Sequence, residues 1–183
     1  MQTYKLTNNK TLEVTQDEYP NNPRHDDNLS KMICFHGRYS LGDKHNYKHQ
    51  DYSGWAEMEK AIIKNESPAV ILPLFLYDHS GITISTSPFS CKWDSGQIGF
   101  VFISKDKVKN EYGVKRVTKK EVEKATKVLL AELETYDLYL RGEVYGYTLI
   151  DENGCIEDSC FGFIGSDIET NGILDNISEK IVG

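Results

Sequence analysis

Side chains that can bind a metal ion or activate a nucleophile concentrate in two parts of the sequence. Four of the five histidines lie between positions 25 and 49, and the fifth lies in the segment YDHSGITISTSPFSCKWDSGQ, residues 77–97. Imidazole, thiolate and carboxylate groups are the usual ligands of zinc and similar divalent ions. The candidate donors are the histidines and four neighbours: His25, His36, His45, His49, His79, Asp43, Asp78, Cys91 and Asp94. Their spacing alone does not show which of these residues would bind a metal ion. A solvated polar loop without a metal would contain the same residue types.

The segment 77–97 also permits a nucleophile or a purely structural hairpin. Cys91 and His79 could form a thiolate–imidazole pair, although no signature of a cysteine enzyme surrounds Cys91. The hydroxyl run at 85–87 suits an exposed strand, and Asp94-Ser95-Gly96 suits a turn. The hairpin interpretation therefore needs no chemistry from this segment.

Motifs for other chemistries are missing from the sequence. The chain contains no phosphate-binding loop, no dinucleotide fingerprint and no G-x-S-x-G elbow. His45 and His49 have the spacing of a helical zinc motif, but their loop contains Gly42 and Asn46 and lacks the general-base glutamate of that motif. An enzyme would have to depend on the His, Asp and Cys group alone.

The elements that must position these residues follow from hydrophobic periodicity and turn residues. Strands are predicted on both sides of Asn8-Asn9 and at 30–36, 69–76, 97–104, 143–150 and 155–163. Pro73 predicts an edge or a bulge in its strand. Helices are predicted at 53–65, 104–113, 119–140 and, interrupted by Gly172, 166–181. The segments 16–28 and 37–52 are predicted loops, and 77–97 a hairpin that joins two apolar strands.

These elements predict an α+β fold with a mostly antiparallel sheet and three to four helices packed against it. The length of 183 residues fits a single domain over 1–183. The four cysteines include no C-x-x-C pair, which favours reduced thiols in a cytoplasm. No signal peptide or membrane-spanning run is present, so we expect a soluble cytoplasmic protein without a membrane partner.

The net charge of −7 is unevenly distributed along the chain. Residues 1–120 contain 17 Lys and Arg against 14 Asp and Glu, whereas residues 121–183 contain 4 against 14. A solvated surface explains such an acidic third, and so does a surface that meets a basic partner protein. A nucleic-acid binder would carry the opposite sign on its recognition face, so direct nucleic-acid binding is not expected.

A resemblance to a known family rests on three segments: CFHGRYSLGD (34–43), LPLFLYDHSGITISTSPFSCKWDSGQIGFVFIS (72–104) and ETYDLYLRGEVYGYTLIDENGCIEDSCFGF (134–163). These segments resemble a family of small proteins carried by phages and mobile elements of Gram-positive bacteria. The resemblance spans most of the chain, and its most specific part is D-H-S-G followed by S-P-F-S-C-x-W-D-S-G-Q. Several phage proteins of this type are regarded as anti-CRISPR proteins that inhibit the RNA-guided effector nuclease of type II systems.

The resemblance implies a phage-encoded inhibitor that binds this nuclease and blocks target-DNA loading or cleavage without being an enzyme. It also places six residues in the most recognisable segments, where they are expected to hold one structural zinc or similar divalent ion: His36, Asp43, Asp78, His79, Cys91 and Asp94. The alternatives are a metal-dependent hydrolase acting on nucleotides or nucleic acid, and a small protein that binds some other basic bacterial target.

Overall fold

The computed structural model describes residues 1–182 and has an α+β fold. Two antiparallel sheets of four strands each and three α-helices make up this part of the chain. The chain divides into two compact units. The terminal unit consists of Met1–Pro23 and Leu138–Gly183, and the central unit is Arg24–Asp137. The expectation of one domain over 1–183 stays a prediction, whereas that of one sheet is wrong, because the strands of the two chain ends pair only with one another.

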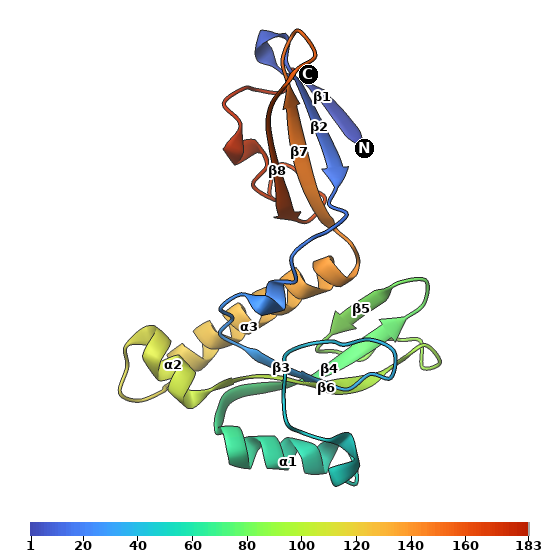
Figure 1. The fold of residues 1–183 in the computed structure, drawn as a ribbon. Coiled ribbons are helices and arrows are strands. Elements are labelled where there is room, and N and C mark those ends of the chain that lie inside the picture. The colour runs from blue at the N-terminus through green and yellow to red at the C-terminus, as the bar shows by residue number, and fades with distance from the viewer. Residues whose placement is uncertain (183) are drawn as a thin grey trace. The chain divides into compact units, whose positions relative to one another are not determined.

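The central unit is a sheet with helices on both faces. Its strands lie in the order β3 (Lys31–Cys34), β6 (Ser95–Ser104), β4 (Pro68–Asp78) and β5 (Ile82–Ser85). Helix α1 (Trp55–Glu66) covers one face, where Met58 and Ile62 pack against Ile33, Phe100 and Phe102. Figure 1 shows α3 on the opposite face of this sheet and α2 beyond the end of β6. Burial on both faces explains the nearly continuous apolar sequence of β4 and β6.

Helices α2 (Lys105–Tyr112) and α3 (Lys119–Leu140) begin where their capping residues predict. Ser104 Oγ accepts a hydrogen bond from Lys107 N, and Thr118 donates to the Glu121 carboxylate as in a capping box. Gly142, at φ 74°, follows the end of α3. The predicted apolar stripe of α3 is buried at Ala125, Leu129, Leu133 and Tyr136.

The segment 77–97 differs from the predicted simple hairpin. It forms the additional strand β5, which pairs with one edge of β4, and the chain then returns to the other edge of β4 as β6. Pro73 lies where β4 pairs with β6 alone, and the β4–β6 register shifts between Leu74 and Phe75. The first of the two alternatives expected of this proline, a local edge position, is confirmed.

The terminal unit is the second sheet, with the strand order β1 (Gln2–Lys5), β2 (Thr11–Gln16), β7 (Val144–Ile150) and β8 (Ile156–Ile164). Both predicted hairpins of the chain ends are therefore confirmed. Leu12, Val14, Tyr147 and Leu149 form the core on one sheet face together with Ile173 and other residues of the C-terminal segment. The C-terminal segment thus takes the place of a covering helix.

The predicted helix over 166–181 is wrong. The structure has turns there and one short 3-10 helix, η4 (Leu174–Asn176). Gly165 and Gly172 have φ values of 97° and 92°, which interrupt helical backbone. Asp167 accepts hydrogen bonds from Glu169 N and Thr170 Oγ1, and such local bonds compete with helix formation. The other short 3-10 helices are η1 (Thr7–Asn9), η2 (Pro23–His25) and η3 (His49–Asp51).

Candidate functional site

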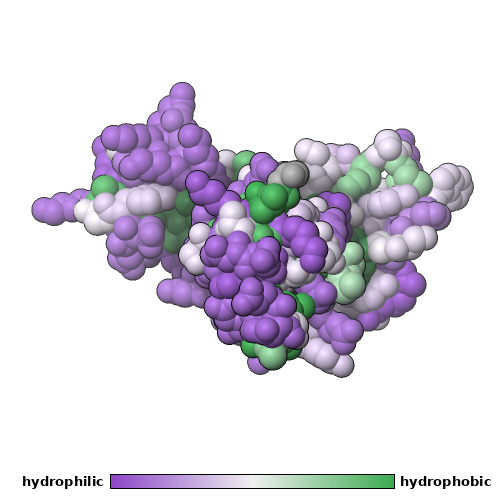
Figure 2. Space-filling model, turned by 90° about the horizontal axis from the view of Figure 1, so that it is seen from above, coloured by the Kyte–Doolittle hydropathy of each residue, from purple (hydrophilic) through white to green (hydrophobic). Residues whose placement is uncertain are grey.

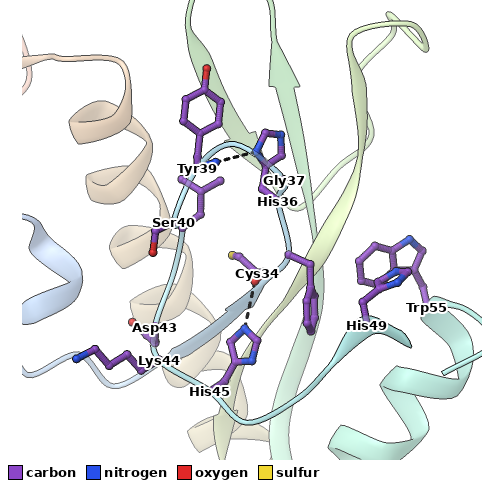
Figure 3. Close-up of a pocket in the computed structure, with 12 residues that line it drawn as sticks. Cys34, His36, Gly37, Tyr39, Ser40, Asp43, Lys44, His45, His49 and Trp55 are labelled. Carbon is purple, nitrogen blue, oxygen red and sulfur yellow. Dashed lines mark hydrogen bonds between the residues drawn. The ribbon is translucent and has the colours of Figure 1, made fainter. Parts of the chain in front are cut away.

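An open cavity of about 610 Å³ lies in the central unit, between the loop that follows β3 and the start of α1. Figure 3 shows the side chains around it, several of which are aromatic or histidine rings. Its lining consists of Cys34, Phe35, His36, Gly37, Tyr39, Ser40, Leu41, Asp43, Lys44, His45, His49 and Trp55. Three of the five histidines thus meet at one cavity, and Cys34 and Asp43 also belong to its lining.

A buried ion pair fixes the shape of the loop. Arg24 donates to both carboxylate oxygens of Asp43, at 3.0 and 2.7 Å, and its side chain is only 1% exposed. Asp43 Oδ2 also accepts a hydrogen bond from Met32 N at 2.8 Å. The neighbouring Gly42 N donates to Tyr136 Oη of α3 at 3.0 Å. Asp43 therefore holds the loop against β3 and has both oxygens in use.

His36 and Cys34 have structural partners at the cavity. His36 Nδ1 accepts hydrogen bonds from Arg38 N and Tyr39 N, both at 3.3 Å, and its ring stacks on the Tyr39 ring. Burial raises the pKa of the Cys34 thiol to about 12. Cys34 is therefore a protonated thiol at neutral pH and a poor nucleophile.

His45 and His49 line the aromatic side of the cavity. His45 Nε2 lies 3.1 Å from Cys34 O, which can only accept, so Nε2 carries the proton. His45 Nδ1 is then a buried acceptor, and it has no hydrogen-bond partner within residues 1–182. The His49 ring makes edge contacts with Phe35 and Trp55, with ring centroids 5.7 and 5.0 Å apart. These rings form a surface on which a flat or apolar group of a ligand can pack, and the two histidines are less well placed to transfer protons.

Asp94 is the centre of a second group of predicted residues. Its Oδ2 lies 3.2 Å from His79 Nδ1 and accepts a hydrogen bond from Cys91 Sγ at 3.7 Å. Asp78 N donates to Asp94 O at 2.8 Å, which joins the ends of β4 and β6. His79 and Cys91 thus share a carboxylate partner. Nucleophilic catalysis needs the cysteine to contact its base directly, so this geometry lends no support to a thiolate–imidazole pair.

Asp78 connects the two groups of predicted residues through an ion pair. Its Oδ2 accepts a hydrogen bond from Arg38 Nη2, and Arg38 belongs to the loop that lines the cavity. The Arg38 side chain is 70% exposed, so the pair contributes little stability. The loop and the 77–97 segment are nevertheless neighbours, as a shared site would require.

The zinc prediction named His36, Asp43, Asp78, His79, Cys91 and Asp94. Within residues 1–182, no three His, Cys, Asp or Glu side chains are arranged to hold a metal ion. The structure brings His79 and Cys91 to the same carboxylate oxygen of Asp94. His36, Asp43 and Asp78 have different partners. Asp43 does not fit a ligand role, because Arg24 occupies both of its oxygens. Metal binding therefore stays a prediction from the sequence.

Arg24 is the residue of this region that the sequence did not reveal. It lies in a polar loop, 19 positions before Asp43, and no local pattern marks it as buried. Glu132 of α3 completes the arrangement, because it accepts hydrogen bonds from Leu29 N and Ser30 N and lies 3.6 Å from Arg24 Nη1. Only the fold brings these charges together.

Comparisons with protein-family models, curated proteins and solved structures found no match to the chain. None of the helices within residues 1–182 combines the length and the apolar composition that a membrane-spanning helix needs.

Proposed function

We propose that this protein is a phage-encoded inhibitor of a type II CRISPR effector nuclease, which it binds without catalysing a reaction. The residues that resemble anti-CRISPR proteins, at 34–43, 72–104 and 134–163, suggest this target. Inhibition by binding requires a complementary surface and no catalytic group.

The distribution of charge between the two units carries the proposal. The terminal unit contains 4 Lys and Arg against 12 Asp and Glu, a net charge of −8, whereas the central unit contains 17 against 16, a net charge of +1. The nuclease holds its RNA–DNA heteroduplex in a positively charged channel and must load target DNA before cleavage. An acidic unit that docks on such a basic surface competes with DNA, and electrostatic steering speeds the encounter.

The geometry of the predicted residues supports a binding role over a catalytic one. Asp94 lies between His79 and Cys91, and the Cys34 thiol has a pKa raised to about 12 by burial. Two charged groups of the cavity loop make internal ion pairs, Asp43 with Arg24 and Arg38 with Asp78. These contacts stabilise a loop rather than activate a nucleophile.

A charge-matched pair of variants tests the proposal. The first variant neutralises four exposed acidic residues of the terminal unit, through Glu18→Gln, Glu152→Gln, Glu169→Gln and Asp175→Asn. The second neutralises four exposed acidic residues of the central unit, through Asp26→Asn, Asp27→Asn, Asp51→Asn and Glu134→Gln. The proposal predicts that the first variant inhibits DNA cleavage by a guide-loaded nuclease at least roughly tenfold more weakly than the second. Equal inhibition by the two variants would contradict the acidic unit as the docking element.

A further inference from the structure

A pocket of about 490 Å³ in the terminal unit combines two exposed aromatic rings with two acidic side chains. It is lined by Thr15, Gln16, Asp17, Glu18, Tyr19 and Phe161. The Tyr19 side chain is 88% exposed and Phe161 is 52% exposed. On the face of the molecule in Figure 2, hydrophilic residues predominate and apolar residues form small separate areas. Two large exposed rings that share one pocket with carboxylates therefore need an explanation.

A β-bulge places Phe161 in this pocket. The β7–β8 register pairs Tyr145 with Phe163 and Gly146 with Phe161, so Gly162, at φ 95°, is the extra residue. Without the bulge, Phe161 and Phe163 would lie on the same face of the sheet, because side chains alternate along a strand. Phe163 instead packs into the core beside Tyr147, while Phe161 lies on the opposite, open face.

Gly146 provides the floor on which the Phe161 ring rests. A Cβ atom at position 146 would lie 2.1 Å from Phe161 Cδ1, so only glycine leaves room for the ring in this position. One side of the Phe161 ring thus packs on the backbone of β7, and much of the ring stays exposed. The strand β8 lies at the edge of its sheet, as Figure 1 shows, so Phe161 has a neighbouring strand on one side only.

The wall that carries Tyr19 and the carboxylates is held in place by hydrogen bonds. Asp17 N donates to Val144 O at 2.8 Å, and Asp17 Oδ1 accepts from Tyr19 N at 2.9 Å, as in an Asx turn. Asp17 Oδ2 and the Glu18 carboxylate have no partner within the described part of the chain, 1–182. Two carboxylates are thus available beside the aromatic rings.

We propose that this pocket binds an arginine side chain of a basic protein partner. A guanidinium group stacks on aromatic faces and pairs with carboxylates, which are the two groups that this pocket presents. None of the lining residues is basic, so the pocket contains no internal cation that competes. The net charge of −8 on the terminal unit opposes a second copy of this chain as the occupant and favours a basic one. That the partner is the CRISPR nuclease rests on the proposed function, whereas recognition of arginine does not.

Two matched peptides test the pocket without the nuclease. Ac-Gly-Arg-Gly-NH2 is titrated into the full chain and compared with Ac-Gly-Cit-Gly-NH2, in which citrulline keeps the shape of arginine without its charge. NMR follows the Tyr19 and Phe161 ring signals up to roughly 20 mM peptide, since a single side chain makes few contacts. The arginine peptide is expected to cause saturable shifts and to bind roughly fivefold or more tightly than the citrulline peptide. Equal binding of the two peptides, or no shift with either, would overturn the proposal.

Variants then separate the pocket from the rest of the surface. Phe161→Ala and Asp17→Asn are expected to weaken arginine binding at least roughly threefold, whereas Ile156→Ala, at a 70% exposed position of the same strand, leaves it unchanged. Unchanged binding in Phe161→Ala refutes the pocket. If the wild-type protein binds the arginine peptide but does not inhibit the nuclease, the pocket stands and the proposed function fails. If Phe161→Ala inhibits the nuclease as well as the wild type does, the pocket is not the contact and the proposed function stands.

Discussion

Replacing Arg24 with methionine should strongly destabilise the central unit. The guanidinium group donates to Asp43, Asn28 and the Ser30 carbonyl oxygen, and Glu132 lies within ion-pair distance. Its side chain is 1% exposed, whereas the Asp43 and Glu132 side chains are 20% and 16% exposed. Arg24→Met therefore leaves two largely buried carboxylates without their cation.

The expected loss follows from the cost of an unpaired buried charge. Removal of one partner of a buried pair costs about 3–5 kcal/mol, and the residual exposure of both carboxylates places Arg24→Met near the lower end, at about 3 kcal/mol. With a urea slope near 2 kcal/mol/M, the unfolding midpoint falls by about 1.5 M. Trp55 and Trp93 both belong to the central unit, so tryptophan fluorescence reports on this unit selectively.

Arg116→Met is the matched control, because Arg116 is exposed and the same side chain is introduced. We expect it to change the free energy of unfolding by less than about 0.5 kcal/mol. Arg24→Lys should fall between the two, since lysine keeps the charge and loses the bidentate geometry. A loss below about 1 kcal/mol in Arg24→Met would refute the role assigned to this ion pair.

Three further predictions concern the chemistry of single side chains. The hydrogen bond to Asp158 raises the pKa of Tyr147 to about 12, so the phenol should stay protonated at pH 11, and Asp158→Asn should lower its pKa in a spectrophotometric titration. Because the pKa in the folded protein lies above the unfolded value near 10, this interaction stabilises the fold fully below pH 10, and its contribution is lost as the pH rises toward 12; an unchanged Tyr147 titration in Asp158→Asn would contradict the assignment. Iodoacetamide at pH 8 should modify the exposed Cys155 and Cys160 well before Cys34, whose pKa burial raises to about 12, and mass spectrometry that finds Cys34 modified first would refute this order. Gly99→Ala should lower the free energy of unfolding by at least about 2 kcal/mol, because its Cβ would lie 1.8 Å from Ile33 O, whereas Gly96→Ala meets no atom within 4 Å; similar urea midpoints for the two variants would show that the β3–β6 contact is looser than described.

Local signals in the sequence were sufficient for most individual elements. The Asn-Gly turn at 153–154 predicted the β7–β8 hairpin, and the capping residues Ser104 and Thr118 predicted the starts of α2 and α3. The failed helix over 166–181 shows the limit of this reasoning. Its apolar spacing resembles a helix, but those residues cover a sheet through turns, and tertiary burial of Ile168 and Ile173 decided their conformation.

Contacts between distant residues could not be predicted in the same way. The sequence placed Asp43 among candidate metal ligands, whereas in the structure Asp43 forms an ion pair with Arg24. This partner becomes apparent only when the loop is folded against β3. Similarly, the sequence placed Phe161 in a predicted strand without indicating which sheet face it occupies, and the bulge at Gly162 places it on the open face. The sequence named His79 and Asp94 only as candidate ligands; the structure makes them neighbours, because strands β4 and β6 that flank their segment pair directly.

Target-DNA loading by a guide-loaded type II effector nuclease, measured by electrophoretic mobility shift at increasing inhibitor, tests the central claim most directly. The proposed function predicts that wild-type protein abolishes loading at a saturating, stoichiometric ratio, and that neutralising Glu18, Glu152, Glu169 and Asp175 restores loading, whereas neutralising the matched acidic residues of the central unit does not. Unimpaired DNA loading in an excess of the wild-type protein, across type II effectors, would contradict it.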